Sequence, residues 1–585
     1  MVPSLRHAAI AGALLALACS RDSSRAGAPD RGRERDAGPP PPPEEVIVVA
    51  EPGGLDAAGA EQEAAAPLED ALGRVRAIAT VRSLSTAGRV SITCRLARGA
   101  DGAGAARDIA DALRGARAPA GMAPPSLTRR TSAIEGLRWI VTSTAASRDD
   151  MAGVRDDIIR PALERVAGVT GLALCGGAGA PLVRVVIDPD RLDATGLDLA
   201  AVRAALLRSS GSSGFRSLDE IAAAPVDVPG TLDTAASLRD LATIEEGADE
   251  PTCLARTATA PAALSIEVAI DPSPGAGNRV RDQIAAIEEQ LPAGFRVARP
   301  PAGPALELRF EAPAGTDLAT LDRIAAAKTE ELGAMQGVAA VLVESGAPIG
   351  SIEPEPVGIR ALVAVEDGAA SDAVVTAAAT AAGVGVRIAS GPHAELRIQL
   401  RGAELDLLGR AAQEIAGAAL KVHGVAATGV LAAGRLPRVD VRPDMSRTAG
   451  TGLSRDDIVA AGRAAFEGAA AGQLARGGRR IPIRIQLGAG RPGPEMIDRV
   501  KLRTATGALV PLSSVASVVL TEGPAAVLHI DRQRAVEIWV QPATGADRSG
   551  VLAGLRRAVG GSVPPGIEVT WPEVPPPAPK PPAGK

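Results

Sequence analysis

The stretch Val439-Asp-Val-Arg-Pro-Asp444, with Gly452-Leu453 after it, decides the fold because the chain contains this pattern twice. The earlier copy reads Val183-Arg-Val-Val-Ile-Asp188 and is followed, at the same spacing, by Gly196-Leu197. In each copy alternating apolar residues predict a strand, and the Gly-Leu pair precedes a helical pattern. A repeated order of this kind indicates a duplicated structural module.

The repeat continues outward from these positions. Asp188, Gly196, Asp444 and Gly452 define the equivalent turns, and the helix predicted over Ser454–Phe466 follows the later one. Farther along, the segment Leu238–Ile244 resembles the one that begins at Leu512, and we expect the first of these to be a strand. We therefore interpret the chain as two copies of one α/β module array.

Each half is expected to contain small split βαβ, ferredoxin-like units. Val46–Leu113 has a strand, helix, strand, strand, helix order, and a second unit is expected over Arg138–Leu207. In that second unit the Gly176-Gly177 turn is expected to lead directly into the strand Leu182–Ile187. The pattern begins again at Leu306, so the predicted class is α+β with tandem ferredoxin-like subdomains in two repeated halves.

The composition excludes several kinds of partner. Of 585 residues, 46% are hydrophobic, which is enough for several cored domains. Aromatic residues make up only 1% and tyrosine is absent, which argues against base-stacking surfaces and aromatic ligand pockets. The net charge is −5 with both signs interspersed, so we expect no nucleic acid partner.

The amino terminus is typical of a targeting signal. Arg6 and His7 precede the small or apolar run Ala8–Ala18, and Ala16-Leu17-Ala18-Cys19 resembles a bacterial lipobox whose Cys19 is lipidated. Ser20 follows the cysteine, which favours the outer membrane over the inner membrane. The alternative is an ordinary cleaved signal peptide with an incidental cysteine.

These patterns give a complete predicted domain order. It consists of a signal (1–19), a Pro- and Arg-rich tether (20–45), a first half with two ferredoxin-like subdomains and a small docking-like insert (46–299), a Pro-rich join (300–304), a second half (305–571) and a Pro-rich tail (572–585).

Neither catalysis nor a metal site finds support in the sequence. The four histidines, His529 included, lie outside any metal or His–carboxylate spacing, so we expect no catalytic, cofactor or metal residues. Asp188 and Asp444 are candidates for paired carboxylates, but capping of their own turns is the favoured interpretation. Cys94, Cys175 and Cys253 allow one disulfide and one free thiol, yet three small buried side chains are favoured.

The order of motifs resembles the periplasmic porter region of resistance–nodulation–division (RND) efflux pumps, the acriflavine-resistance family. The resemblance rests on Val48–Gly53, Ala66–Leu72, Asp188–Leu192 with Gly196-Leu197, Asp444 with Gly452-Leu453, Gly472-Gln473, Val510–Ala516 and Gly523-Pro524-Ala525. It covers nearly all of the chain from Val46 to Trp571. The resemblance implies a homotrimer and partners among RND pumps, adaptors and outer-membrane channels.

The departures from the family lead to a specific expectation. RND pumps carry proton-coupling charges in transmembrane helices, and this sequence has no apolar run of the roughly 18 residues needed to cross a bilayer. We expect a lipid-anchored, porter-like protein on the periplasmic side that is not an enzyme and not itself a proton-driven pump. It would bind a ligand or associate with an efflux assembly; the alternative is a degenerate porter scaffold with a structural or interaction role.

Overall fold

A computed structural model describes most of the chain after residue 43. The described residues are 44–53, 55–117, 119, 122–131, 137–228, 235–271, 274–298, 305–310, 312–347, 358–366, 386–388, 394–431, 434–488, 494–560 and 563–572. The predicted signal with Cys19, nearly all of the tether, the join at 300–304 and the tail beyond residue 572 lie outside them.

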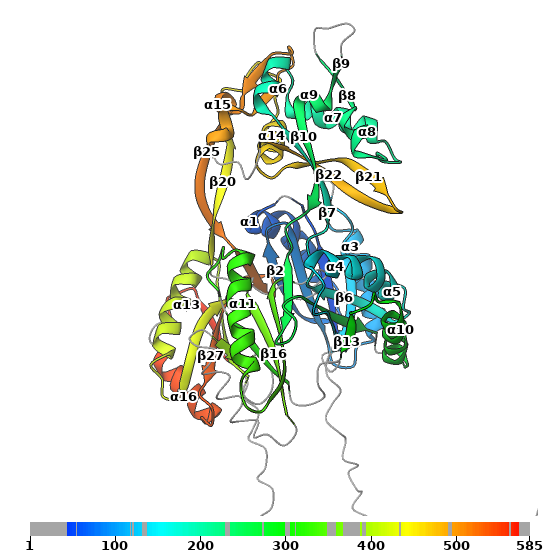
Figure 1. Cartoon of the computed structure of the whole chain (residues 1–585). Coiled ribbons are helices and arrows are strands. Elements are labelled where there is room, and N and C mark those ends of the chain that lie inside the picture. The colour runs from blue at the N-terminus through cyan, green and yellow to red at the C-terminus, as the bar shows by residue number, and fades with distance from the viewer. Residues whose placement is uncertain are drawn as a thin grey trace, which may run out of the picture. The chain divides into compact units, whose positions relative to one another are not determined.

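Nine of the described strands form a first sheet, to which both halves of the sequence contribute (Figure 1). In spatial order they are β28 (Glu568–Thr570), β18 (Leu396–Arg401), β27 (Gln533–Pro542), β26 (Ala526–Ile530), β2 (Ile78–Thr86), β3 (Arg89–Leu96), β1 (Glu44–Ala50) and β4 (Ser126–Thr131), with β19 (Val425–Leu431) also on β27. The halves meet where β2 pairs antiparallel with β26, from Arg82 opposite Ile530 to Thr86 opposite Ala526.

A second nine-stranded sheet is also built from strands of both halves of the sequence. Its nine described strands are, in order, β13 (Arg296–Ala298), β5 (Leu137–Thr142), β12 (Ala263–Ile270), β11 (Cys253–Thr257), β15 (Val338–Gly346), β16 (Ile359–Val365), β14 (Ala305–Phe310) and β17 (Val386–Ile388), with β6 (Val169–Cys175) also on β12. Here the halves join where β11 pairs antiparallel with β15.

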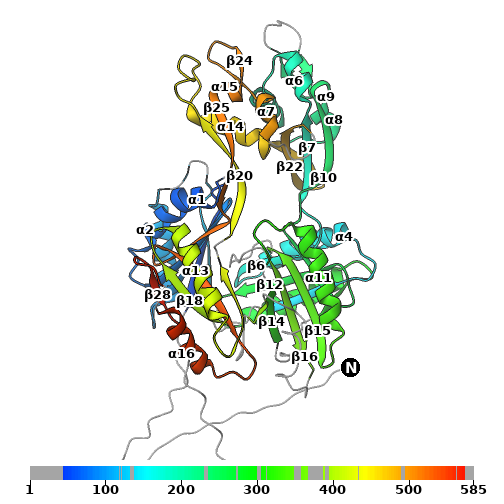
Figure 2. The ribbon, with the colours of Figure 1, turned by 90° about the vertical axis from the view of Figure 1, so that its left-hand side faces the viewer.

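Helices cover one face of each sheet and form its hydrophobic cores. On the first sheet they are α1 (Ala57–Gly59), η1 (Ala60–Ala65), α2 (Ala66–Leu72), α3 (Gly102–Arg114), α13 (Leu405–Ala419) and α16 (Arg548–Val559). On the second sheet they are α4 (Arg148–Gly153), η2 (Val154–Ile159), α5 (Arg160–Glu164), α10 (Ala276–Gln290) and α11 (Leu318–Gly333), the last lying across β15 and β16 (Figure 2).

The strand orders confirm the predicted fold class. The first sheet consists of one unit with the strand order β28-β18-β27-β19 and one with the order β2-β3-β1-β4. The second sheet consists of one unit with the order β13-β5-β12-β6 and one with the order β15-β16-β14-β17. Both are the order of a split βαβ, ferredoxin-like unit. Four such units are therefore present in the described chain, and each sheet joins one from each half.

A smaller layer lies outside the two large sheets. It contains the four-stranded sheet β10 (Ala242–Ala248), β7 (Pro181–Ile187), β22 (Arg479–Leu487) and β21 (Ala469–Arg476), the ribbon of β20 (Arg435–Pro443) and β25 (Ala516–Pro524), and the short pairs β8 (Pro225–Asp227) with β9 (Ala235–Ser237) and β23 (Lys501–Arg503) with β24 (Leu509–Pro511). Its helices are α6 (Pro189–Thr195), α7 (Leu199–Ser210), α8 (Leu218–Ala222), α9 (Leu238–Leu241), α14 (Arg455–Phe466), η3 (Pro494–Asp498) and α15 (Leu512–Val515).

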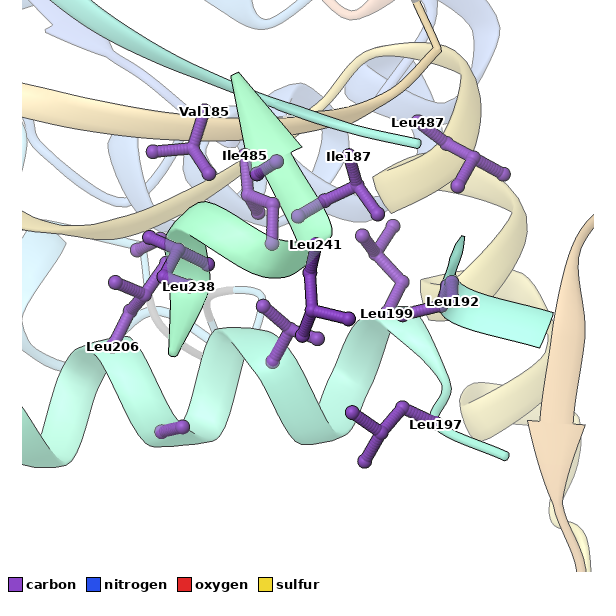
Figure 3. Close-up of a cluster of buried hydrophobic side chains, with 14 of the residues drawn as sticks. Val185, Ile187, Leu192, Leu197, Leu199, Leu206, Leu238, Leu241, Ile485 and Leu487 are labelled. Carbon is purple, nitrogen blue, oxygen red and sulfur yellow. The ribbon is translucent and has the colours of Figure 1, made fainter. Parts of the chain in front are cut away.

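Side chains from both halves fill the core of this smaller layer. Figure 3 shows Ile187 of β7 close to Leu241 of α9 and to Ile485 of β22. All three side chains are at most 1% exposed. Because β22 runs parallel to β7, the second half adds a strand directly to the first half here as well.

Two expectations about secondary structure were wrong. Leu238–Ile244 is not one strand: Leu238–Leu241 is a helical turn whose Ser237 and Asp240 form a capping box, and β10 begins only at Ala242. The strand Leu182–Ile187 forms as predicted (β7), but it does not belong to the ferredoxin-like unit expected over Arg138–Leu207. It pairs with β10 in the smaller layer, and β12 lies beside β6 instead. Alternating hydrophobicity marked the strands correctly but could not assign them to a sheet.

The three cysteines also differ from the favoured expectation. Cys175 at the end of β6 and Cys253 at the start of β11 form a disulfide with Cα atoms 5.1 Å apart. Cys94 is buried and free. The disulfide links the two ends of the segment that contains α6 to α9, because β6 before this segment and β11 after it both pair with β12.

Candidate functional site at the seam of the halves

The predicted turn positions occupy equivalent places in the two repeats. Asp188 N–H donates to the Leu241 carbonyl at 2.9 Å, and Asp444 N–H donates to the Val515 carbonyl at 2.8 Å. Gly196 and Gly452 both take left-handed backbone, with φ of 65° and 73°, which favours glycine.

The carboxylates of Asp188 and Asp444 serve their own turns. Asp188 accepts from the backbone of Asp190 at 2.9 Å, and Asp444 accepts from the backbone of Ser446 at 3.0 Å. The Ser446 hydroxyl also donates to Asp444 and, with burial opposing it weakly, holds the pKa of that carboxyl below its usual range. The two side chains bond locally rather than to each other.

Other charged and aromatic side chains are engaged away from these turns. In the basic turn Arg476–Arg480, Arg476 pairs with Glu246 at 2.6 Å and Arg479 pairs with Asp157, and both acidic partners come from the first half. Phe215 is buried in the core of the smaller layer and Phe310 in that of the second sheet. These phenylalanines lie in separate cores and do not line one pocket.

A buried polar cluster lies at the seam where β2 meets β26. His529 Nε2 is 2.8 Å from Glu61, and its Nδ1 is 2.9 Å from Glu69. Arg534 donates to Glu61 through Nε at 2.5 Å and Nη2 at 2.9 Å. The Ser83 hydroxyl donates to Glu69. The side chains of Glu61, Glu69 and His529 are 6%, 2% and 8% exposed, so these three are largely buried.

A π-helical turn brings the two glutamates to the same histidine. In a regular α-helix, residues 61 and 69 would point about 80° apart, since eight residues at 3.6 per turn overshoot two turns. The segment Ala60–Ala65 is π-helical, and its wider turn takes up about one additional residue. Both carboxylates therefore reach the face of the helix that packs on β26.

The charges of this cluster stabilise one another. Burial alone would lower the pKa of His529, but the hydrogen bonds that its ring donates to Glu61 and Glu69 outweigh it and raise the pKa to about 9. Burial would likewise raise the pKa of Glu61, but hydrogen bonds to His529 and Arg534 lower it to about 2. At neutral pH the cluster holds two carboxylates, one imidazolium and one guanidinium, which balance in charge.

An open cleft with a volume of about 540 Å³ lies over this cluster. Its walls come from the β26–β27 turn, the segment before α13 and the segment before β28. The lining residues are Glu61, Arg401, Gly402, Ala403, His529, Arg532, Gln533, Arg534, Gly566 and Glu568. The volume falls within the range of small-molecule sites in proteins.

The turn at the rim of the cleft has an unusual backbone. Asp531 and Arg532 have φ of 50° and 68°, where non-glycine residues are uncommon. Asp531 is held by β2, since its N–H donates to the Val81 carbonyl at 2.7 Å and its carboxylate accepts from Val81 N–H at 3.1 Å. Arg401 reaches the same carboxylate at 3.4 Å.

Ionic bridges also join the halves within both sheets. In the second sheet Arg360 donates to Glu344 at 2.6 Å and to Glu267 at 3.3 Å. Burial would raise the pKa of Glu267, but Arg138 and Arg360 lower it to about 2. In the first sheet Arg82 pairs at 2.6 Å with Glu537, whose side chain is 0% exposed.

Several groups of the cluster are already committed to partners. The two ring nitrogens of His529 are both committed to carboxylates, so the imidazole presents no free base to the cleft. Within the part of the chain that the structure describes, no group of three or more His, Cys, Asp or Glu residues is placed to hold a metal ion. In that same part, no helix has both the length and the apolar character needed to cross a bilayer.

Comparison with known proteins agrees with this architecture. The model of the AcrB/AcrD/AcrF family matches residues 36–301 and 363–575, which together form most of the chain. The chain belongs to the AcrB/AcrD/AcrF family. Multidrug resistance protein MdtC of Proteus mirabilis (strain HI4320) is 27% identical over 261 residues, covering 40% of this chain and 25% of MdtC. MdtC of Yersinia pseudotuberculosis serotype O:1b (strain IP 31758) is 27% identical over 258 residues, with the same shares.

Those alignments span about a quarter of the length of these curated AcrB/AcrD/AcrF-type relatives. Solved structures show that the fold extends further. A heavy metal efflux pump in crystal form II superposes with a TM-score of 0.79 at 15% identity, covering 92% of this chain and 79% of that one. Its crystal form I gives 0.78 at 16% identity, with 90% and 79% covered.

Sequence reasoning missed the seam cluster. His529 was considered isolated, because its partners Glu61 and Glu69 lie 468 and 460 positions away. The available signal was the helical run that contains both glutamates near the start of the first half. A buried glutamate on an otherwise apolar helix face requires a cationic partner, although the sequence does not identify it.

Proposed function

We propose that this member of the AcrB/AcrD/AcrF family is a lipid-anchored, porter-like protein on the periplasmic side of the envelope. It binds a ligand or associates with an efflux assembly, and it is not itself a proton-driven pump. The observation that carries the proposal is that both halves share each large sheet, with a ligand-sized cleft where they join. Such a body suits recognition of a ligand or a protein partner.

The Cys175–Cys253 disulfide supports an exported location. Structural disulfides persist in oxidising compartments such as the periplasm and are rare in the cytosol. Anchoring through Cys19, with Ser20 favouring the outer membrane, is the part of the proposal that rests on the sequence alone.

Lipidation is tested by labelling cells that express the full chain with a clickable palmitate analogue. Incorporation in the wild type and its loss in Cys19→Ala support the anchor. Equal labelling of both, or release of the unlabelled wild type into the periplasm, contradicts it.

The partners proposed from the family are an RND pump, an adaptor and an outer-membrane channel, with the chain itself as a homotrimer. Crosslinking in native membranes followed by mass spectrometry tests these partners, and native mass spectrometry of the purified chain tests the trimer. A monomer without any envelope transport partner contradicts this part of the proposal.

A degenerate porter scaffold with an interaction role is the second candidate, favoured by the dispersal of the phenylalanines. Titration of the purified full chain with a hydrophobic cation (rhodamine 6G) and a bile salt (cholate) distinguishes the two. Saturable binding favours the ligand-binding porter, and protein partners without small-molecule binding favour the scaffold. Proton-dependent dye uptake into liposomes that contain only this chain would contradict the non-pump proposal.

A further inference from the structure

The cleft over the seam carries an excess of positive charge. Its lining includes four cationic side chains, Arg401, His529, Arg532 and Arg534, and two acidic ones, Glu61 and Glu568. A concave site with this imbalance attracts anions. Which of the cations remain available to a ligand depends on their existing partners.

Two of the four cations are fully engaged in the floor of the cleft. His529 uses both ring nitrogens on Glu61 and Glu69. Arg534 spends Nε and Nη2 on Glu61, and its Nη1 donates to the Ala403 carbonyl at 3.2 Å. These groups hold the floor rigid and nearly neutral, and they offer few donors upward.

The other two arginines retain donors. Among the described residues, Arg401 contacts Asp531 through Nη1 at 3.4 Å. Its Nε also has no hydrogen-bond partner, but that atom is buried, so the terminal nitrogens are the donors available to a ligand. Arg532 lies 3.7 Å from Asp70, beyond hydrogen-bond distance, and its side chain is 57% exposed. A guanidinium has five N–H donors and binds carboxylate or phosphate oxygens in pairs, so both side chains can accept an oxyanion.

The backbone gives an independent reason to assign Arg532 to a ligand. Left-handed backbone costs a non-glycine residue free energy, and such two-residue hairpin turns favour Asn-Gly or Asp-Gly. Asp531 is explained by its bonds to Val81, but Arg532 sits where glycine would be less strained. The Arg532 side chain makes a long ion pair with Asp70, at 3.7 Å, and backbone strain of this kind is common at binding sites.

We propose that this cleft binds a small organic molecule bearing a carboxylate or phosphate group, held by Arg401 and Arg532. The inference rests on the ligand-binding form of the proposed function and names its site and ligand class. Carboxylates and phosphates share the planar or tripodal oxygens that guanidinium groups recognise. The fixed Glu61–His529–Arg534 floor keeps the arginines in place before the ligand arrives.

The test uses isothermal titration of the purified full chain with citrate and with glycerol 3-phosphate, in chloride buffer at constant ionic strength. We expect saturable binding of at least one probe, and the stronger of the two identifies the headgroup. Arg532→Gln and Arg401→Gln should each weaken binding at least tenfold. Arg107→Gln, an exposed arginine on α3 remote from the cleft lining, should leave it unchanged.

Arg532→Gly separates binding from folding. Glycine relieves the left-handed backbone, so the Tm should equal or exceed that of the wild type while anion binding is lost. Absence of saturable binding for both probes, or binding that survives both Arg401→Gln and Arg532→Gly, overturns the proposal. If rhodamine 6G or cholate still binds in that case, with an affinity that Arg401→Gln and Arg532→Gly leave unchanged, the ligand-binding function stands and only this site is wrong; if neither binds, both fail.

Discussion

Glu61 and His529 hydrogen-bond at 2.8 Å although 468 positions separate them in the sequence. The contact joins the first helical segment of the first half to a strand near the end of the second half. The contact is buried and ionic, and Arg534 also binds Glu61. The protonation of His529 is therefore coupled to the stability of the junction between the two halves.

Stability should fall at alkaline pH because of this histidine. The pKa of His529 rises from 6.5 to about 9 in the folded chain, so its contribution is complete below about pH 6.5 and is lost as the pH rises through 9. The shift corresponds to about 3 kcal/mol. Urea unfolding of the wild type at pH 6 and pH 10 should show this loss, whereas His529→Gln should show a flatter profile. Identical profiles in the two proteins would refute the linkage.

Removing the negative charge of Glu61 should lower the pKa of His529. Glu61→Gln leaves only one carboxylate on the imidazole while burial still opposes its charge, so we expect a fall of at least one unit, followed by NMR titration of the ring protons. Glu63→Gln, which changes an exposed residue of the same π turn, is the matched control and should leave the titration unaltered.

The disulfide should stabilise the first half substantially. Replacing both Cys175 and Cys253 by serine removes a crosslink between residues 78 positions apart, at an expected cost of about 2–4 kcal/mol in the free energy of unfolding. The unreduced, denatured Cys19→Ala chain should label one thiol. That thiol is Cys94, whose pKa burial raises to about 12, so it should be unreactive in the folded chain. Three labelled thiols would show that the bridge is absent.

The two copies of the repeat offer a matched pair of glycines. Both have positive φ, so alanine should cost about 1 kcal/mol at either position. At Gly452, however, a Cβ would lie 2.5 Å from the Ala505 side chain, whereas at Gly196 nothing lies within 4 Å. Gly452→Ala should therefore be more destabilising than Gly196→Ala by roughly 1–3 kcal/mol, measured by denaturant unfolding. Equal losses of unfolding free energy for the two variants would mean that Ala505 can move away from the added Cβ without destabilising the fold.

Much of the fold follows from local pattern, and the rest depends on long-range pairing. The Asp–Gly-Leu repeat predicts equivalent turns from local sequence, and Gly196 and Gly452 both have left-handed backbone, which favours glycine. The sheet to which Leu182–Ile187 belongs could not be predicted, since alternating hydrophobicity identifies a strand but not the strand with which it pairs. The same limit hid the Cys175–Cys253 pairing.

The candidate site was less predictable than the fold. Glu61 and Glu69 face one histidine only because a π turn replaces a regular α-turn, and no residue in Ala60–Ala65 signals that change. Arg401 ends β18 and Arg532 lies in the turn between β26 and β27, so they line the same cleft only after β18 and β27 pair. Charge clusters built across a duplicated fold require three-dimensional information.

The pairing of strands from different halves also sets the order in which the two large sheets can be completed during folding. If the chain is exported as proposed, β2 has an open edge before residues 526–530 leave the export channel, and β11 has one before residues 338–346 emerge. Until those residues arrive, the first half has two unpaired strand edges, and such edges are templates for aggregation. The Cys175–Cys253 bridge, which needs only early residues, can form during that wait. Newly exported chains should therefore depend on envelope chaperones that shield strand edges until translocation ends.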